Sequence, residues 1–70
     1  MRFLIVIEKA KRGFSAYSPD LPGCVAAGAT RRSVEKTMRE AIEFHLEGIR
    51  EEGDRVPASR CYSTYVDILA

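Results

Sequence analysis

Only one stretch of this 70-residue chain, residues 31–52, has the apolar periodicity of an α-helix. Its apolar side recurs at steps of three and four residues and consists of Val34, Met38, Ala41, Ile42, His45, Leu46 and Ile49. Thr30 comes just before the helix as its predicted N-cap, and Gly53 just after it as its predicted left-handed cap. Because there is a single helix, about 10 Å wide, it can cover only one face of any sheet that the rest of the chain forms.

The other apolar segments have the short, alternating character of β-strands. Residues 2–10 are apolar on both sides, which is typical of a strand in the middle of a sheet. A turn at Gly13 leads into a second strand, 14–18, and small residues make up a third, 24–30, which suggests close packing by the helix or by another subunit. Residues 61–69 alternate again after the helix. The predicted fold is therefore α+β, with the order β-β-β-α-β and one helix packed on one face of the sheet.

This topology leaves apolar area uncovered. A right-handed crossover through the helix sets the last strand parallel to the third, and the first strand is its natural neighbour. Four strands at about 4.8 Å spacing are roughly 15 Å across, so the face without the helix carries Leu4 and Val6, or their alternates Phe3 and Ile5. Monomeric proteins rarely expose an apolar surface of this size to water. We expect the uncovered face or a sheet edge to meet another copy, which gives a homo-oligomer, either a dimer or a tetramer.

Length and composition narrow the class of protein. The chain is expected to be a single domain, residues 1–70, and a domain of this size buries only roughly 60% of its unfolded surface. Eleven Lys and Arg against ten Asp and Glu give a net charge of +1, which is no argument for binding phosphate backbones. Cys24 and Cys61 lack the spacing of a zinc site, and the apolar start is too short for an export signal or a membrane span. We expect a cytoplasmic protein with reduced thiols, no metal and no cofactor.

Residues 17–24, YSPDLPGC, contain the sharpest candidate for chemistry, Asp20. Pro22 and Gly23 are typical of the two central positions of a type II turn. As a metal ligand for phosphodiester cleavage, Asp20 would need several converging carboxylates, and only two other acidic residues lie in or near the strands. The alternative is that Asp20 accepts hydrogen bonds from amides of its own turn, or contacts a partner protein. The sequence favours this alternative.

Other candidates for chemistry are weaker. His45 has no carboxylate three or four residues away on the helix, and neither cysteine lies at a helix N-terminus beside a histidine, as an activated thiolate would. A basic patch that suits a nucleic acid or an acidic partner forms if the first turn lies beside the start of the helix. Its members are Lys9, Lys11, Arg12, Arg31 and Arg32. No catalytic constellation results, and we predict that the chain is not an enzyme.

The segment YSPDLPGCVAAGATRRSVEKTMREAIEFHLEGIREEGDRVP resembles the N-terminal domain of the HicB antitoxin family. That family carries a Y-x-P-D-L-P-G-C segment, a G-x-T step into a helix, and an A-I-E-x-H/W-L helix end before a Gly and a Pro. The resemblance runs from the first strand to the last. It implies a partial RNase H-like fold, which agrees with the strand and helix order predicted above.

The resemblance also implies a partner. Family members pair with HicA, a small toxin of double-stranded-RNA-binding fold that cleaves messenger RNA, and neutralise it by covering its active surface. The matching residues are Tyr17, Asp20, Leu21, Pro22, Gly23 and Cys24 in the loop motif, and Gly28 and Thr30 at the helix entry. We expect Tyr17, Asp20, Leu21 and Pro22 to bind the partner, a HicA-type toxin.

Two features depart from the family pattern. Many HicB proteins continue into a helix-turn-helix or ribbon-helix-helix domain that binds the operator; this sequence stops at Ala70, so we do not expect it to bind DNA directly. The chain is also near neutral, where an antitoxin facing a basic toxin is expected to be acidic, although helix glutamates offer a local acidic face. The alternatives are a metal-dependent nuclease of RNase H-like fold that uses Asp20 with a second chain's carboxylates, and a nucleic-acid-binding module.

Overall fold

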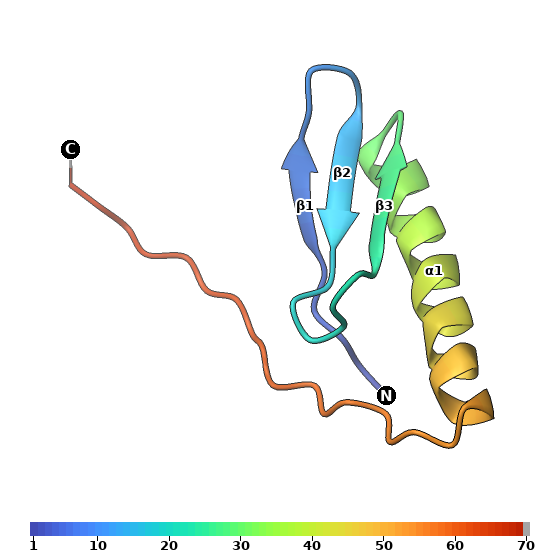
Figure 1. Cartoon of the computed structure of the whole chain (residues 1–70). Helices are drawn as coiled ribbons and strands as arrows, with labels where there is room; N and C mark the ends of the chain where they lie inside the picture. The colour runs from blue at the N-terminus through green and yellow to red at the C-terminus, as the bar shows by residue number, and fades with distance from the viewer. Residues whose placement is uncertain (70) are drawn as a thin grey trace.

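The computed structural model describes residues 1–69, in which three strands precede one helix (Figure 1). The strands β1 (Val6–Lys9), β2 (Phe14–Tyr17) and β3 (Val25–Gly28) form an antiparallel sheet in the order β1-β2-β3. The helix α1 (Arg31–Glu51) follows and packs on one face, mainly over β3 and β2. The predicted α+β class and the β-β-β-α part of the order are confirmed.

The last predicted strand, residues 61–69, does not pair with the sheet of its own chain. We call these residues the C-terminal segment; they lie extended and away from the sheet (Figure 1). The radius of gyration is 13.9 Å, above the roughly 11 Å expected of a compact chain of this length. The prediction of a fourth strand beside the first within one chain is therefore wrong. Alternation of apolar and polar residues shows that a segment can pair as a β-strand, but it does not show which sheet edge the segment pairs with.

The register of the sheet separates a helix side from an open side. Ala16 lies opposite Ile7 on one neighbour and Ala26 on the other, and all three pack into the core under α1. Tyr17 lies opposite Val6 and Val25, and these residues alternate to the other face. Phe3 and Ile5 continue the helix side ahead of β1. The uncovered face thus carries Val6, as one of the two predicted arrangements had it.

Both ends of α1 are where the sequence predicts them. The Ser33 amide donates to Thr30 Oγ1 and the Thr30 amide donates to Ser33 Oγ, each at 3.0 Å, which forms a capping box. At the other end Gly53 has a φ of +75°, the left-handed conformation that ends many helices. The buried core consists of Ala16, Leu21, Cys24, Val34, Met38 and Leu46. No helix within residues 1–69 has both the length and the apolar character to cross a membrane.

The small residues of β3 are explained by the helix above them. A Cβ atom added to Gly28 would lie 2.7 Å from Ser33 Oγ and 2.8 Å from the backbone nitrogen of Val34. Real Cβ atoms do not come this close to other heavy atoms, and the contact with Val34 is with backbone that cannot turn away. Of the two explanations that the sequence offered, packing by the helix is the one observed.

Replacing Gly28 with Ala is expected to destabilise the fold by about 1–3 kcal/mol, because the added methyl group must push α1 away from β3. The measurement is urea unfolding followed by circular dichroism. Gly48→Ala is the matched control, since a Cβ at Gly48 meets nothing within 4 Å and alanine favours helix. Equal stability of the two variants would contradict this account of β3.

Candidate functional site

The connection between β2 and β3, the 17–24 loop, consists of two successive turns. The Leu21 amide donates to the Ser18 carbonyl at 3.1 Å, and the Cys24 amide donates to the Leu21 carbonyl at 3.0 Å. The Ser18 amide donates to the Cys24 carbonyl at 3.2 Å and closes the base of the loop. Gly23 has a φ of +82°, which the third position of a type II turn requires. The turn that the sequence predicts at Pro22 and Gly23 is confirmed.

Three side chains fasten this loop to the core. Leu21 is completely buried and Cys24 nearly so. Ser18 is buried as well, and its hydroxyl donates to the carbonyl of Leu4 at 3.0 Å, which ties the loop to the chain just before β1. No local pattern predicts this role of Ser18, because the Leu4 carbonyl comes within its reach only once β1 and β2 have paired.

The four residues predicted to bind a partner are placed in three different ways. Tyr17 and Pro22 are exposed, and the Tyr17 side chain lies beside Val25 on the open side of the sheet. Asp20 is half-buried. Leu21 is buried beneath the loop, so in this structure it holds the loop in place and does not offer a surface.

Asp20 binds a part of the chain far away in sequence. Its Oδ2 atom accepts hydrogen bonds from the Arg60 amide at 3.1 Å and from the Cys61 amide at 3.0 Å. The predicted partners of Asp20 were amides of its own turn or another protein, but the amides of Leu21 and Cys24 already bond to carbonyl groups within the loop. Local patterns could not reveal this contact, because it joins positions 40 and 41 residues apart. We call it the Asp20 clamp.

The contact between Asp20 and residues 60–61 shifts the pKa values of Asp20 and Cys61. The backbone hydrogen bond from Cys61 is the main cause that lowers the pKa of Asp20, and the Arg60 amide and charge act in the same direction. The nearby Asp20 carboxylate is the main cause that raises the pKa of the Cys61 thiol, because it favours the protonated thiol over the thiolate. Burial raises the pKa of Cys24. Both cysteines are free thiols, and neither has the environment of an activated nucleophile.

The clamp is expected to weaken in acid. A carboxylate whose pKa is lowered in the folded state contributes its stabilisation fully above the ordinary value of 3.8 and loses it as the pH falls through the lowered pKa. The NMR shifts of the Arg60 and Cys61 amide protons should therefore titrate with a midpoint below 3.8. In the Asp20→Asn variant this titration should disappear. A midpoint at or above 3.8 would contradict the clamp.

The same contact is expected to protect the Cys61 thiol from alkylation. In Asp20→Asn the pKa of this thiol should return toward its ordinary value, so iodoacetamide should react several-fold faster at pH 8, since the gain in thiolate exceeds the loss of intrinsic nucleophilicity. Mass spectrometry of the peptide that contains Cys61 measures the rate. Buried Cys24 is the internal reference, and its rate should not change. An unchanged Cys61 rate would show that the thiol does not interact with Asp20.

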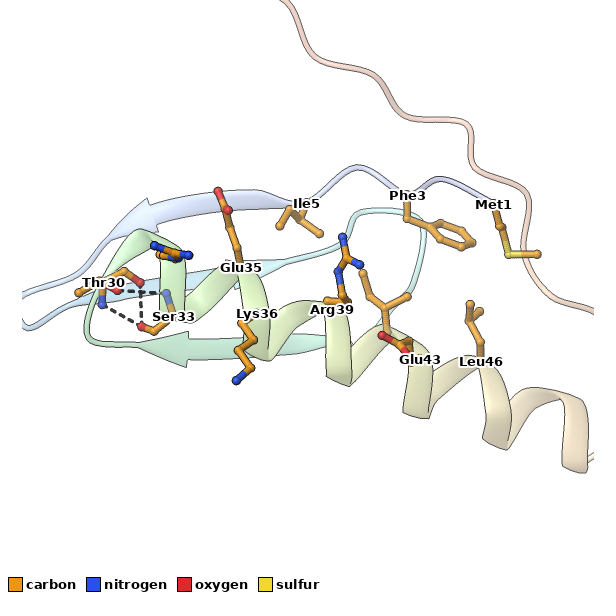
Figure 2. Close-up of a pocket in the computed structure, with 12 residues that line it drawn as sticks. Met1, Phe3, Ile5, Thr30, Ser33, Glu35, Lys36, Arg39, Glu43 and Leu46 are labelled. Carbon is orange, nitrogen blue, oxygen red and sulfur yellow. Dashed lines mark hydrogen bonds between the residues drawn. The ribbon is translucent and has the colours of Figure 1, made fainter.

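A groove lies between α1 and the chain that leads into β1, on the helix side of the sheet, beside the part that α1 does not cover (Figure 2). Its volume is about 1130 Å³. Phe3 and Ile5 point into it from the N-terminal stretch, and Leu46 points into it from the helix (Figure 2). Charged helix residues, among them Lys36 and Glu43, form its rim. We call this the β1–α1 groove.

The predicted basic patch can form. A Cβ on Gly13 would lie 3.1 Å from the Cα of Ala29, so the first turn touches the entry to the helix. All five predicted basic residues are exposed at this end of the molecule.

A metal site is a separate question. Residues 1–69 contain no group of three or more His, Cys, Asp or Glu side chains that could hold an ion.

Comparison with known proteins shows which protein family this chain belongs to. A family model described as a HicB-like antitoxin of a bacterial toxin–antitoxin system matches residues 3–68. The structure is also similar to a chain of a solved HicA3 and HicB3 toxin–antitoxin complex, with a TM-score of 0.67 and 34% identity over 83% of this chain and 72% of that one. The chain belongs to the HicB-like antitoxin family, as the loop and helix motifs predicted.

Relatives occur in phage and archaea. The chain is 37% identical to an uncharacterised 14.9 kDa protein from the rep–hol intergenic region of Haemophilus phage HP1, over 96% of this chain but 50% of that protein. It is 28% identical to a UPF0150 protein of Thermoplasma acidophilum, over 81% of this chain and 84% of that protein. The chain thus spans about half the length of the phage relative.

Proposed function

We propose that this chain binds a HicA-type toxin that cleaves messenger RNA and neutralises it by covering its active surface. The observation that carries the proposal is the structural similarity to a chain of a HicA3 and HicB3 complex, together with the family match over residues 3–68. In this proposal the chain performs no catalysis and acts in the cytoplasm, where messenger RNA is translated. Inhibition by occlusion needs only shape and affinity, so the proposal requires no cofactor.

The surface proposed to meet the toxin is the exposed side of the 17–24 loop, with Tyr17, Asp20 and Pro22 in contact and Leu21 as its buried support. A loop closed by three backbone hydrogen bonds loses little conformational freedom on binding. Tyrosine is among the residues that contribute most to interface affinity. A carboxylate has about four acceptor positions, so Asp20 can hold the two amides of the clamp and still accept a bond from a basic toxin residue.

A second candidate function rests on the basic end of the molecule. The exposed lysines and arginines around the first turn and the start of α1 would suit an anionic ligand such as RNA. Binding of this kind would weaken steeply with added salt, because each neutralised phosphate releases counterions. The nuclease alternative requires carboxylates from a second chain to join Asp20, and the clamp already engages that carboxylate.

The toxin proposal is tested with a purified HicA-type toxin, taken from the neighbouring reading frame if one is encoded there. The chain should abolish the toxin's cleavage of a reporter messenger RNA in vitro, and Tyr17→Ala should weaken binding at least about tenfold, or ~1.4 kcal/mol, by isothermal titration calorimetry. Phe44→Ala is the matched control, because Phe44 is an exposed aromatic residue on α1, outside the loop. Uninhibited cleavage by the toxin would disprove the function. Normal inhibition with a stronger effect of Phe44→Ala would move the binding surface to the helix.

The chain without a toxin is expected to leave the same RNA intact in the presence of Mg²⁺, since residues 1–69 supply no metal-binding group. Gel electrophoresis after prolonged incubation is sufficient to check this. Cleavage that depends on Mg²⁺ and disappears in Asp20→Asn would favour the nuclease instead.

A further inference from the structure

The C-terminal segment is apolar and yet it touches little of its own chain. Five of the nine large apolar residues that are exposed in this structure belong to it, namely Tyr62, Tyr65, Val66, Ile68 and Leu69. Their exposed fractions run from 73% to 104%. So much apolar surface on one extended segment marks a binding element, because a monomer in water gains nothing from presenting it.

The sheet has a free edge at β1, where a further strand can pair. β1 is an edge strand in the order β1-β2-β3, so its outer amides and carbonyls have no strand partner within residues 1–69. Its apolar residues nevertheless face both sides of the sheet: Val6 lies on the open side and Ile7 under the helix. The β1–α1 groove continues this edge on the helix side, with Phe3 and Ile5 along one wall. Apolar character on both sides belongs to a strand with neighbours on both edges.

The clamp explains why the segment does not fill this edge in its own chain. Asp20 holds the Arg60 and Cys61 amides at the start of the segment, and from there the chain runs away from β1 (Figure 1). To pair with its own β1, the segment would have to turn toward the sheet after the two amides that Asp20 holds, whereas it diverges from β1 (Figure 1). The direction set by the clamp instead carries residues 62–69 outward, to where a second molecule can meet them.

We propose that the C-terminal segment of one copy pairs with the free edge of β1 in a second copy. The C-terminal segment of the second copy pairs in turn with β1 of the first. The result is a closed two-fold dimer in which each β1 has neighbours on both sides. The eight residues 62–69 reach about 26 Å when extended, and the edge formed by residues 3–9 is about 23 Å long, at about 3.3 Å per residue. The segment is therefore long enough to pair along the whole edge.

Side-chain alternation gives the donated strand a defined orientation. Tyr62, Val66 and Ile68 share one side of the segment, and Tyr65 and Leu69 share the other. The first side fits the β1–α1 groove, whose apolar lining includes Phe3, Ile5, Ile42 and Leu46. The second side then extends the open face beside Val6. This dimer does not depend on the proposed toxin-binding role and would form without a toxin.

The first test is the mass of the full chain by size-exclusion chromatography with light scattering. The native protein should have twice the chain mass of 7.8 kDa, and Val66→Asp should have the mass of one chain. Val25→Asp is the matched control: Val25 is exposed to 66%, against 73% for Val66, but lies on the open face of β3, far from the edge of β1. It should remain dimeric. Circular dichroism should show native helix in both variants.

The second test separates exchange between copies from closure within one. Isotope-filtered NMR on a dimer refolded from ¹³C-labelled and unlabelled chains should show contacts between Val66 or Ile68 of one copy and Ile5 of the other. A monomeric native protein, a dimer that Val25→Asp dissociates while Val66→Asp does not, or contacts found only within one copy would each overturn the proposal.

Discussion

The helix α1 lies so close to β3 that Gly28 leaves no space for a side chain between the strand and the backbone of Val34. This contact fixes the helix over β3 and β2, and consequently away from β1. The rest of the architecture follows from that offset. The core lies beneath α1, the β1–α1 groove opens beside it, and β1, which follows the apolar residues 3–5, lies at an edge of the sheet.

The 17–24 loop is positioned by the same core and not by its own turns alone. Leu21 and Cys24 are buried, and Ser18 reaches back to the carbonyl of Leu4. The two prolines and the glycine give the loop its shape, while the three buried side chains decide where it stands on the protein. Asp20 is thus presented at a fixed place, where its carboxylate accepts two amides from beyond the helix.

Local features were predictable from the sequence and long-range ones were not. The cap at Thr30, the end of α1 at Gly53, the turn at Gly23 and the helix above Gly28 all follow from short-range rules on capping, turns and side-chain size. The partners of Asp20 and the course of residues 61–69 depend on which distant segments meet, and no spacing pattern contains that information. Burial of Leu21 was missed for a related reason, because a leucine in a turn motif can support the loop or cover a partner.

The Asp20 clamp also has a thermodynamic consequence. The carboxylate that holds Arg60 and Cys61 lies in the loop whose outer surface is offered to other molecules. A ligand that competes with the two amides for this oxygen would loosen the hold on the tail, and tightening of the tail would then change the affinity of the loop for that ligand by the same factor. Two surfaces that are separate in the sequence would then respond to each other through one shared acceptor.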